Sequence, residues 1–135
     1  MITTGDVYCI LHDVCTQFGI TEIYDGLNAP TGEVKSERIV IRTGSQSNEA
    51  IWEKSFVNIN FCTPNLFNGD ANTVRLTEIE RMVKPVFKQG DTGSFDGSTY
   101  NYENGGDNWL SQEKDTELRC HYVNVRLLFQ VLNVK

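Results

Sequence analysis

The chain has 135 residues, of which 39% are hydrophobic and 22% are charged, a composition typical of a globular domain rather than a disordered segment. Its formal net charge is −6, and an acidic chain is repelled by phosphate backbones, which argues against a nucleic-acid-binding role. The N-terminal region has no basic segment followed by an apolar core, and no apolar run is long enough to cross a bilayer. We therefore expect one soluble, intracellular domain over residues 1–135.

Residues 3–18 carry the clearest helix pattern. Thr3 is placed to cap the helix, Asp6 lies near its positive end, and Gly19 is placed to end it in a left-handed conformation. Ile2 occupies the position of a hydrophobic staple. The apolar residues recur at helical spacing on one stripe: Val7, Ile10, Leu11, Val14 and Phe18.

A short strand is predicted over residues 20–24. The loop that follows, over residues 25–37, contains Gly26, Pro30 and Gly32, and its length makes it a candidate contact arm. We therefore expect this arm to reach a neighbouring molecule.

Two longer strands follow the arm. Residues 38–43 and 52–62 alternate between apolar and polar side chains, which predicts one buried face in each strand. The polar segment 44–49 joins them, so the pair is predicted to form an extended antiparallel hairpin. The residues on the buried face are Ile39, Ile41, Val57, Ile59 and Phe61.

A second helix is predicted after Pro64 and a short polar loop. Asp70 or Asn72 can cap it, and Pro85 should kink it or break its last turn. Its apolar stripe consists of Leu76, Ile79, Met82, Val83 and Val86.

The C-terminal third is predicted to add three strands. Residues 89–98 look like a glycine-rich connection, and the turn at 104–107 should join a strand around Tyr100 to one around Trp109 as a second hairpin. Residues 112–117 look like a charged connection. The last strand buries Val123, Val125, Leu127, Phe129 and Val131, whereas Leu128 and Leu132 make its other face less polar than usual.

These elements give the order helix, three strands, helix, three strands. Runs of strands joined by hairpins imply a mostly antiparallel sheet, with the two helices packed on one face. The predicted fold class is therefore α+β, in two layers.

The sequence offers little that could support catalysis. The four cysteines have no zinc-ligand spacing, and their pattern fits packed free thiols in a reducing compartment. Cys120 and His121 are neighbours in a strand and therefore point to opposite faces, which separates a nucleophile from its base. A calcium loop starting at Asp91 would need a glutamate at its twelfth position, where Tyr102 stands. We expect no catalysis, cofactor or metal, and an enzyme using Cys120, His121 and Asp115 is the least favoured hypothesis.

Six segments in chain order resemble the tail-completion or tail-terminator proteins of long-tailed bacteriophages and prophages, and together they cover most of the chain. The chain departs from that pattern at Glu37-Arg38, where the family would have an apolar or proline-led start. The segments are Val7–Val14, Ile23–Gly26, Arg38–Ile41, Val57–Asn65, Arg75–Val83 and His121–Phe129.

The resemblance implies a ring, commonly of six copies, that caps the tail tube and joins it to the head. It implies the tail tube protein and the head–tail connector protein as partners, and a place in the tail or neck of the virion after assembly in the bacterial cytoplasm. DNA would pass through an acidic lumen without specific binding. The candidate contact residues are Leu27, Asn28, Pro30, Val34, Ser47, Trp52, Leu128 and Leu132. A small monomeric or dimeric adaptor or inhibitor that binds one protein is the alternative.

Overall fold

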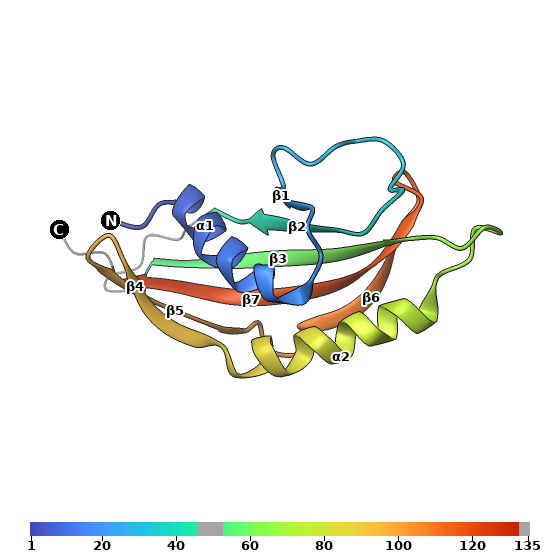
Figure 1. Cartoon of the computed structure of the whole chain (residues 1–135). Coiled ribbons are helices and arrows are strands. Elements are labelled where there is room, and N and C mark those ends of the chain that lie inside the picture. The colour runs from blue at the N-terminus through green and yellow to red at the C-terminus, as the bar shows by residue number, and fades with distance from the viewer. Residues whose placement is uncertain (46–52, 133–135) are drawn as a thin grey trace.

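The computed structural model describes residues 1–45 and 53–132, and over these residues two helices lie on the same side of a curved sheet (Figure 1). The sheet has seven strands and is mostly antiparallel, which confirms the predicted α+β class. The elements are α1 (Thr4–Cys15), the 3-10 helix η1 (Thr16–Phe18), β1 (Ile23–Asp25), β2 (Arg38–Thr43), β3 (Glu53–Pro64), α2 (Thr73–Gln89), β4 (Asp91–Phe95), β5 (Ser98–Asn104), β6 (Leu110–Asp115) and β7 (Cys120–Leu132). Four strands follow α2, not the three that were predicted.

The start of α1 has the predicted caps. The Asp6 backbone N–H donates to Thr3 Oγ1 over 3.2 Å, and the Thr3 N–H donates to Asp6 Oδ2 over 2.9 Å, which completes a capping box. Ile2 and Val7 are both buried, as the staple requires, and Gly19 ends η1 at φ 76°. Local sequence signals therefore mark the start of α1 and the end of η1, which follows it directly.

The strand order is β1-β2-β3-β7-β5-β4, with β6 also paired to β7. The predicted β2–β3 hairpin is confirmed as an antiparallel pair in which Ile39 lies opposite Phe61. β3 and β7 form the central ladder, which runs from the pair Glu53–Val131 to the pair Pro64–Cys120. β1 pairs with β2 in parallel, the one parallel pair among the described strands.

The predicted hairpin between the strands around Tyr100 and Trp109 was wrong. β5 and β6 lie end to end along the same edge of β7, with Asn104 opposite Leu127 and Leu110 opposite Val125. Between them the chain bulges out opposite Arg126, whose carbonyl accepts from the Gly105 N–H and whose N–H donates to the Trp109 carbonyl. β5 and β6 therefore form one strand along β7 that is interrupted by a bulge.

Two segments expected as connections are strands. Residues 91–95 form β4, joined to β5 by a two-residue turn at Asp96-Gly97 in which both residues have positive φ (49° and 77°). Residues 110–115 form β6, and a short turn leads from it into β7. Most of their side chains are exposed or half-buried, so pairing with their neighbours stabilises them more than side-chain burial does.

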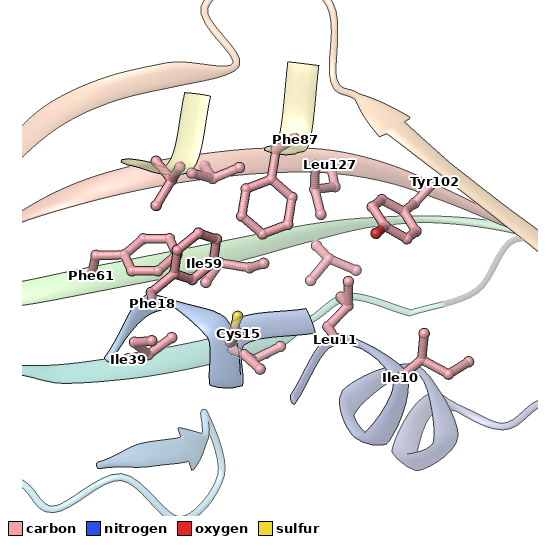
Figure 2. Close-up of a cluster of buried hydrophobic side chains, with 14 of the residues drawn as sticks. Ile10, Leu11, Cys15, Phe18, Ile39, Ile59, Phe61, Phe87, Tyr102 and Leu127 are labelled. Atoms are coloured by element: carbon pink, nitrogen blue, oxygen red, sulfur yellow. The ribbon is translucent and has the colours of Figure 1, made fainter. Parts of the chain in front are cut away.

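The main core lies between the helices and the sheet. Three phenylalanine rings meet there from different elements: Phe18 and Phe61 are 5.5 Å apart, and Phe87 lies 5.9 Å from Phe18 (Figure 2). Phe61 and Phe87 are fully buried. Phe87 comes from the last turn of α2, which runs on to Gln89, so Pro85 does not end the helix.

The N-terminus of α2 is bonded to the end of the arm, which spans residues 26–37 in the structure because Asp25 belongs to β1. Asn72 caps the helix by accepting from the Arg75 N–H over 3.3 Å. Glu37 accepts from Arg75 Nε and Nη2 over 2.7 and 2.8 Å, and from Thr63 Oγ1 over 2.8 Å. The hydrogen bonds from Arg75 hold the pKa of Glu37 below its usual value. Glu37 stands where the resemblance implied an apolar or proline-led start. Its hydrogen bonds link the arm to β3 and to α2.

Candidate functional site

The sheet face opposite the helices carries an aromatic–arginine pair. Phe56 points to this face and is 44% exposed, and the Arg126 guanidinium lies over its ring at 3.9 Å. Leu128 lies opposite Phe56 on β7 and opposite Glu103 on β5, and is half-buried. These four residues form a patch, called here the Phe56 patch, on a face that neither described helix covers.

Polar amides continue the same face beyond the patch. Asn58 and Asn60 from β3 lie beside Asn124 from β7, and the Asn124 side-chain amide donates to Asn58 Oδ1 over 3.3 Å. With Arg42 and Tyr122 they line a shallow hollow, together with Glu113. The face is therefore mixed: apolar and aromatic near the Phe56 patch, polar towards the arm.

The arm folds back onto this face. Val34 donates its N–H to the Leu118 carbonyl over 2.9 Å, and its side chain is only 2% exposed. It belongs to a second apolar cluster with Val40, Cys62 and Cys120. Val34, expected as a contact residue, is therefore a core residue whose side chain the chain itself covers.

The other predicted contact residues lie in different settings. Leu27 is 92% exposed, and Asn28 and Pro30 beside it are exposed at the bend of the arm. Leu128 and Leu132 are half-buried on the open sheet face. Ser47 and Trp52 lie outside the described part of the chain. The structure thus divides the candidates between the arm bend and the sheet face.

Sequence reasoning missed an exposed apolar tip between β3 and α2. Leu66 is 46% exposed and Phe67 fully exposed, in a loop that was expected to be simply polar. The loop is ordered by hydrogen bonds from the Leu66 N–H to the Asp70 carbonyl and from the Gly69 N–H to the Leu66 carbonyl, both 2.8 Å. A cavity of about 540 Å³ lies beside it, bounded also by the arm and the β6–β7 turn. In the sequence, two adjacent apolar residues, Leu66 and Phe67, stand between turn-forming residues, and this pair was the signal that could have revealed the exposed tip.

The outer edge of β4 is a candidate site for pairing with another chain. β4 is paired only with β5 in the described part of the chain, so its outer edge presents free backbone groups. Its sequence has neither a lysine nor a proline, the residues that commonly protect such edges. This edge could accept a strand from another chain.

The three residues of the enzyme hypothesis are not brought together. Asp115 and Cys120 are cross-strand partners on the open face, and Cys120 is fully buried. His121 points the other way, with Nδ1 2.6 Å from Asn65 Oδ1. Within the described residues, no three histidine, cysteine or acidic side chains are grouped to hold a metal.

Cysteine burial predicts a reactivity pattern. Cys9 is exposed and the other three thiols are buried; burial raises the pKa of Cys15 to about 12. In a titration with a chromogenic disulfide reagent, we expect one thiol to react quickly and four after denaturation. Cys9→Ser should abolish the fast phase. Fast modification of Cys62 or Cys120 would show that the arm does not cover them.

No family model matches the chain, and no curated protein is significantly similar to it. Neither described helix combines the length and apolar character needed to cross a membrane.

Proposed function

We propose that the chain is a structural subunit of a phage or prophage tail, forming a ring that terminates the tail tube and joins it to the head. Its partners would be other copies of itself, the tail tube protein and the head–tail connector protein, in the tail or neck of the virion after assembly in the bacterial cytoplasm. The ordered resemblance of six segments supports this proposal, which involves no catalysis, cofactor or metal.

The Phe56 patch is the observation that carries the proposal. Aromatic and arginine side chains are enriched at the centres of protein interfaces, where burial away from water gives them large contributions to binding. A solvated sheet face is ordinarily polar, whereas this one presents Phe56, Arg126 and Leu128 next to each other. A contact between this patch and a different surface of the next copy is heterologous, which closes into a ring where the rotation allows.

The charge of the chain fits the proposed lumen. A net charge of −6 gives a ring a negative field, which lets DNA pass without being held by phosphate contacts. Clusters of lysine or arginine in the lumen would instead bind the DNA phosphates and hinder the passage of the DNA.

The proposal predicts that Phe56→Ala weakens ring formation. Truncating an interface hot spot costs about 2 kcal/mol or more, which is roughly a 30-fold loss of affinity. Native mass spectrometry at several concentrations, with and without tail tube protein, should show rings for the wild-type chain and far fewer for Phe56→Ala. Phe67→Ala, at the separate tip, is the matched control and should assemble like wild type.

A chain that never forms a ring with tube protein would contradict the proposal, and so would rings that tolerate Phe56→Ala. Monomers of the chain alone would not contradict it, since the tube can template assembly.

The second candidate function is a protein-binding adaptor or inhibitor. The exposed tip of Leu66 and Phe67 beside its cavity favours it, because an ordered loop with an exposed aromatic can insert into one partner. A monomer or dimer that binds a single phage or host protein, with binding lost in Phe67→Ala and kept in Phe56→Ala, would favour this function over the ring.

A further inference from the structure

Arg38 is a buried cation with no ion pair among the described residues. Its side chain lies at the start of β2 and the residue is 6% exposed. Nη1 donates to the Pro30 carbonyl over 3.3 Å, whereas Nε is buried and has no hydrogen-bond partner among the described residues. The guanidinium lies 5.6 Å from the centre of the Tyr24 ring.

The Glu22 carboxylate near Arg38 already accepts two other hydrogen bonds. Glu22 precedes β1 and lies beside Arg38 on the open face, and its carboxylate accepts hydrogen bonds from Ser36 and Tyr24. Within the described residues, no carboxylate oxygen lies within ion-pair distance of Arg38. Glu22 therefore interacts with Arg38 electrostatically but not as a direct ion pair. A buried N–H without a partner destabilises a fold, so Arg38 Nε, which has no hydrogen-bond partner among the described residues, can donate to a bound anion.

Arg38 lines a cavity of about 240 Å³ beneath the arm. Arg42 lines the same cavity from four residues further along β2, and both point to the open face of the sheet. The Asn60 amide and Tyr122 also line it and can donate hydrogen bonds. The cavity therefore offers two cations, the buried Arg38 and the exposed Arg42, and neutral donors around one space.

Two acids limit what the cavity can hold. Asp115 and Glu117 also line it, so the four charged side chains of the lining cancel formally. Asp115 Oδ1 accepts from the Leu118 N–H over 2.9 Å, which fixes it to the β6–β7 turn. A ligand with several negative charges would meet these acids, whereas a single small oxyanion can lie against the guanidiniums.

We propose that this cavity is a binding site for one carboxylate or similarly small oxyanion, held by Arg38 and Arg42. The planar guanidinium matches a carboxylate with two parallel hydrogen bonds, which a lysine cannot reproduce. The oxyanion comes either from solution or from an acidic side chain of a second copy of the chain. The site does not depend on the proposed ring, since a free anion can occupy it in a monomer.

Thermal unfolding in sodium acetate, against sodium chloride at equal ionic strength, tests the site. We expect a saturable rise in the Tm of the wild-type chain by a few degrees, because a ligand that binds only the native state stabilises it. Arg38→Met keeps an apolar stem of similar length and should remove the rise while folding as well as wild type in chloride. Arg81→Met, on the exposed surface of α2, should keep the full rise.

The two sources give different results. A rise at protein concentrations where the chain is monomeric identifies a free anion. Self-association in chloride that Arg38→Met abolishes and added acetate reverses identifies a carboxylate of a second copy. If Arg38→Met fails to fold, Arg42→Met in the same titration replaces it. An equal rise in these variants and wild type, or neither an anion-dependent rise nor Arg38-dependent self-association, would overturn the proposal.

Discussion

Replacing Phe87 by alanine is expected to lower the free energy of unfolding by about 3–5 kcal/mol, the usual cost of removing a buried aromatic ring. For a domain of this size, that corresponds to a fall in Tm of roughly 10–20 °C. Phe87 is fully buried and its ring lies 5.9 Å from Phe18, 6.4 Å from Phe61 and 6.5 Å from Tyr102. One side chain thus joins α2 to η1, β3 and β5.

Urea unfolding of Phe87→Ala beside a matched control on the same helix measures this effect. Val74 is 73% exposed at the start of α2, so Val74→Ala should change the free energy of unfolding by less than about 0.5 kcal/mol. Phe87→Leu should fall between the two, since leucine refills part of the space. A loss below about 1 kcal/mol for Phe87→Ala would contradict the packing of the three-phenylalanine core.

The parts of the fold that the sequence predicted are those with a local or periodic signal. The Thr3 cap and the left-handed Gly19 are short-range signals, and both are present in the structure. The alternation in β3 and β7 correctly assigned which side chains face the helices, including Phe61. Burial of one face enforces that alternation, so it is visible in the residues themselves.

The errors in the strands have a common physical cause. β4 and β6 bury few side chains, so they have no alternation to read, and they form because β5 and β7 offer backbone groups to pair. The turn residues at 104–107 suggested a hairpin, but β7 is long enough for both β5 and β6 to pair along one edge. The Asp-Gly pair at 96–97 was the stronger hairpin signal.

The arm could have been placed from its length. A parallel pair needs a crossover connection of about a dozen residues or more, and the stretch between β1 and β2 is that long. A crossover must pass over one face of the sheet, which is why Val34 packs on Val40 and is not free for a partner. Reading the loop only as a contact arm missed this constraint.

The candidate site was predicted only in part. Alternation placed Leu128 and Leu132 on the second face of β7, and the structure has them there, half-buried. The Phe56–Arg126 pair was not predicted, because it depends on the register of β3 against β7, which the two strand sequences do not specify separately. The burial of Arg38 was not predicted either, because it is the folded-back arm that covers this side chain.

Gly90→Ala is the second substitution from which we expect a large effect, a loss of more than about 3 kcal/mol in the free energy of unfolding. Gly90 lies between α2 and β4 at φ 70° and ψ −164°, a backbone conformation that is essentially restricted to glycine. A Cβ there would also lie 1.9 Å from the Tyr102 carbonyl oxygen and 2.9 Å from Glu103 Cα. Both obstacles are backbone atoms of β5, so no side-chain rotation relieves the clash.

A series of three glycines separates strain from clash. Gly97 has φ 77°, and an alanine methyl group there would meet no atom within 4 Å, so Gly97→Ala should cost about 1–2 kcal/mol from backbone strain alone. Gly32 has neither a positive φ nor a neighbour within 4 Å, so Gly32→Ala should be neutral or stabilise by about 0.4–1 kcal/mol through the unfolded chain. The three losses, measured by urea unfolding, should fall in the order Gly90, Gly97, Gly32. A Gly90 variant as stable as the Gly97 variant would contradict both the glycine-only backbone conformation at Gly90 and the close approach of this position to the β5 backbone.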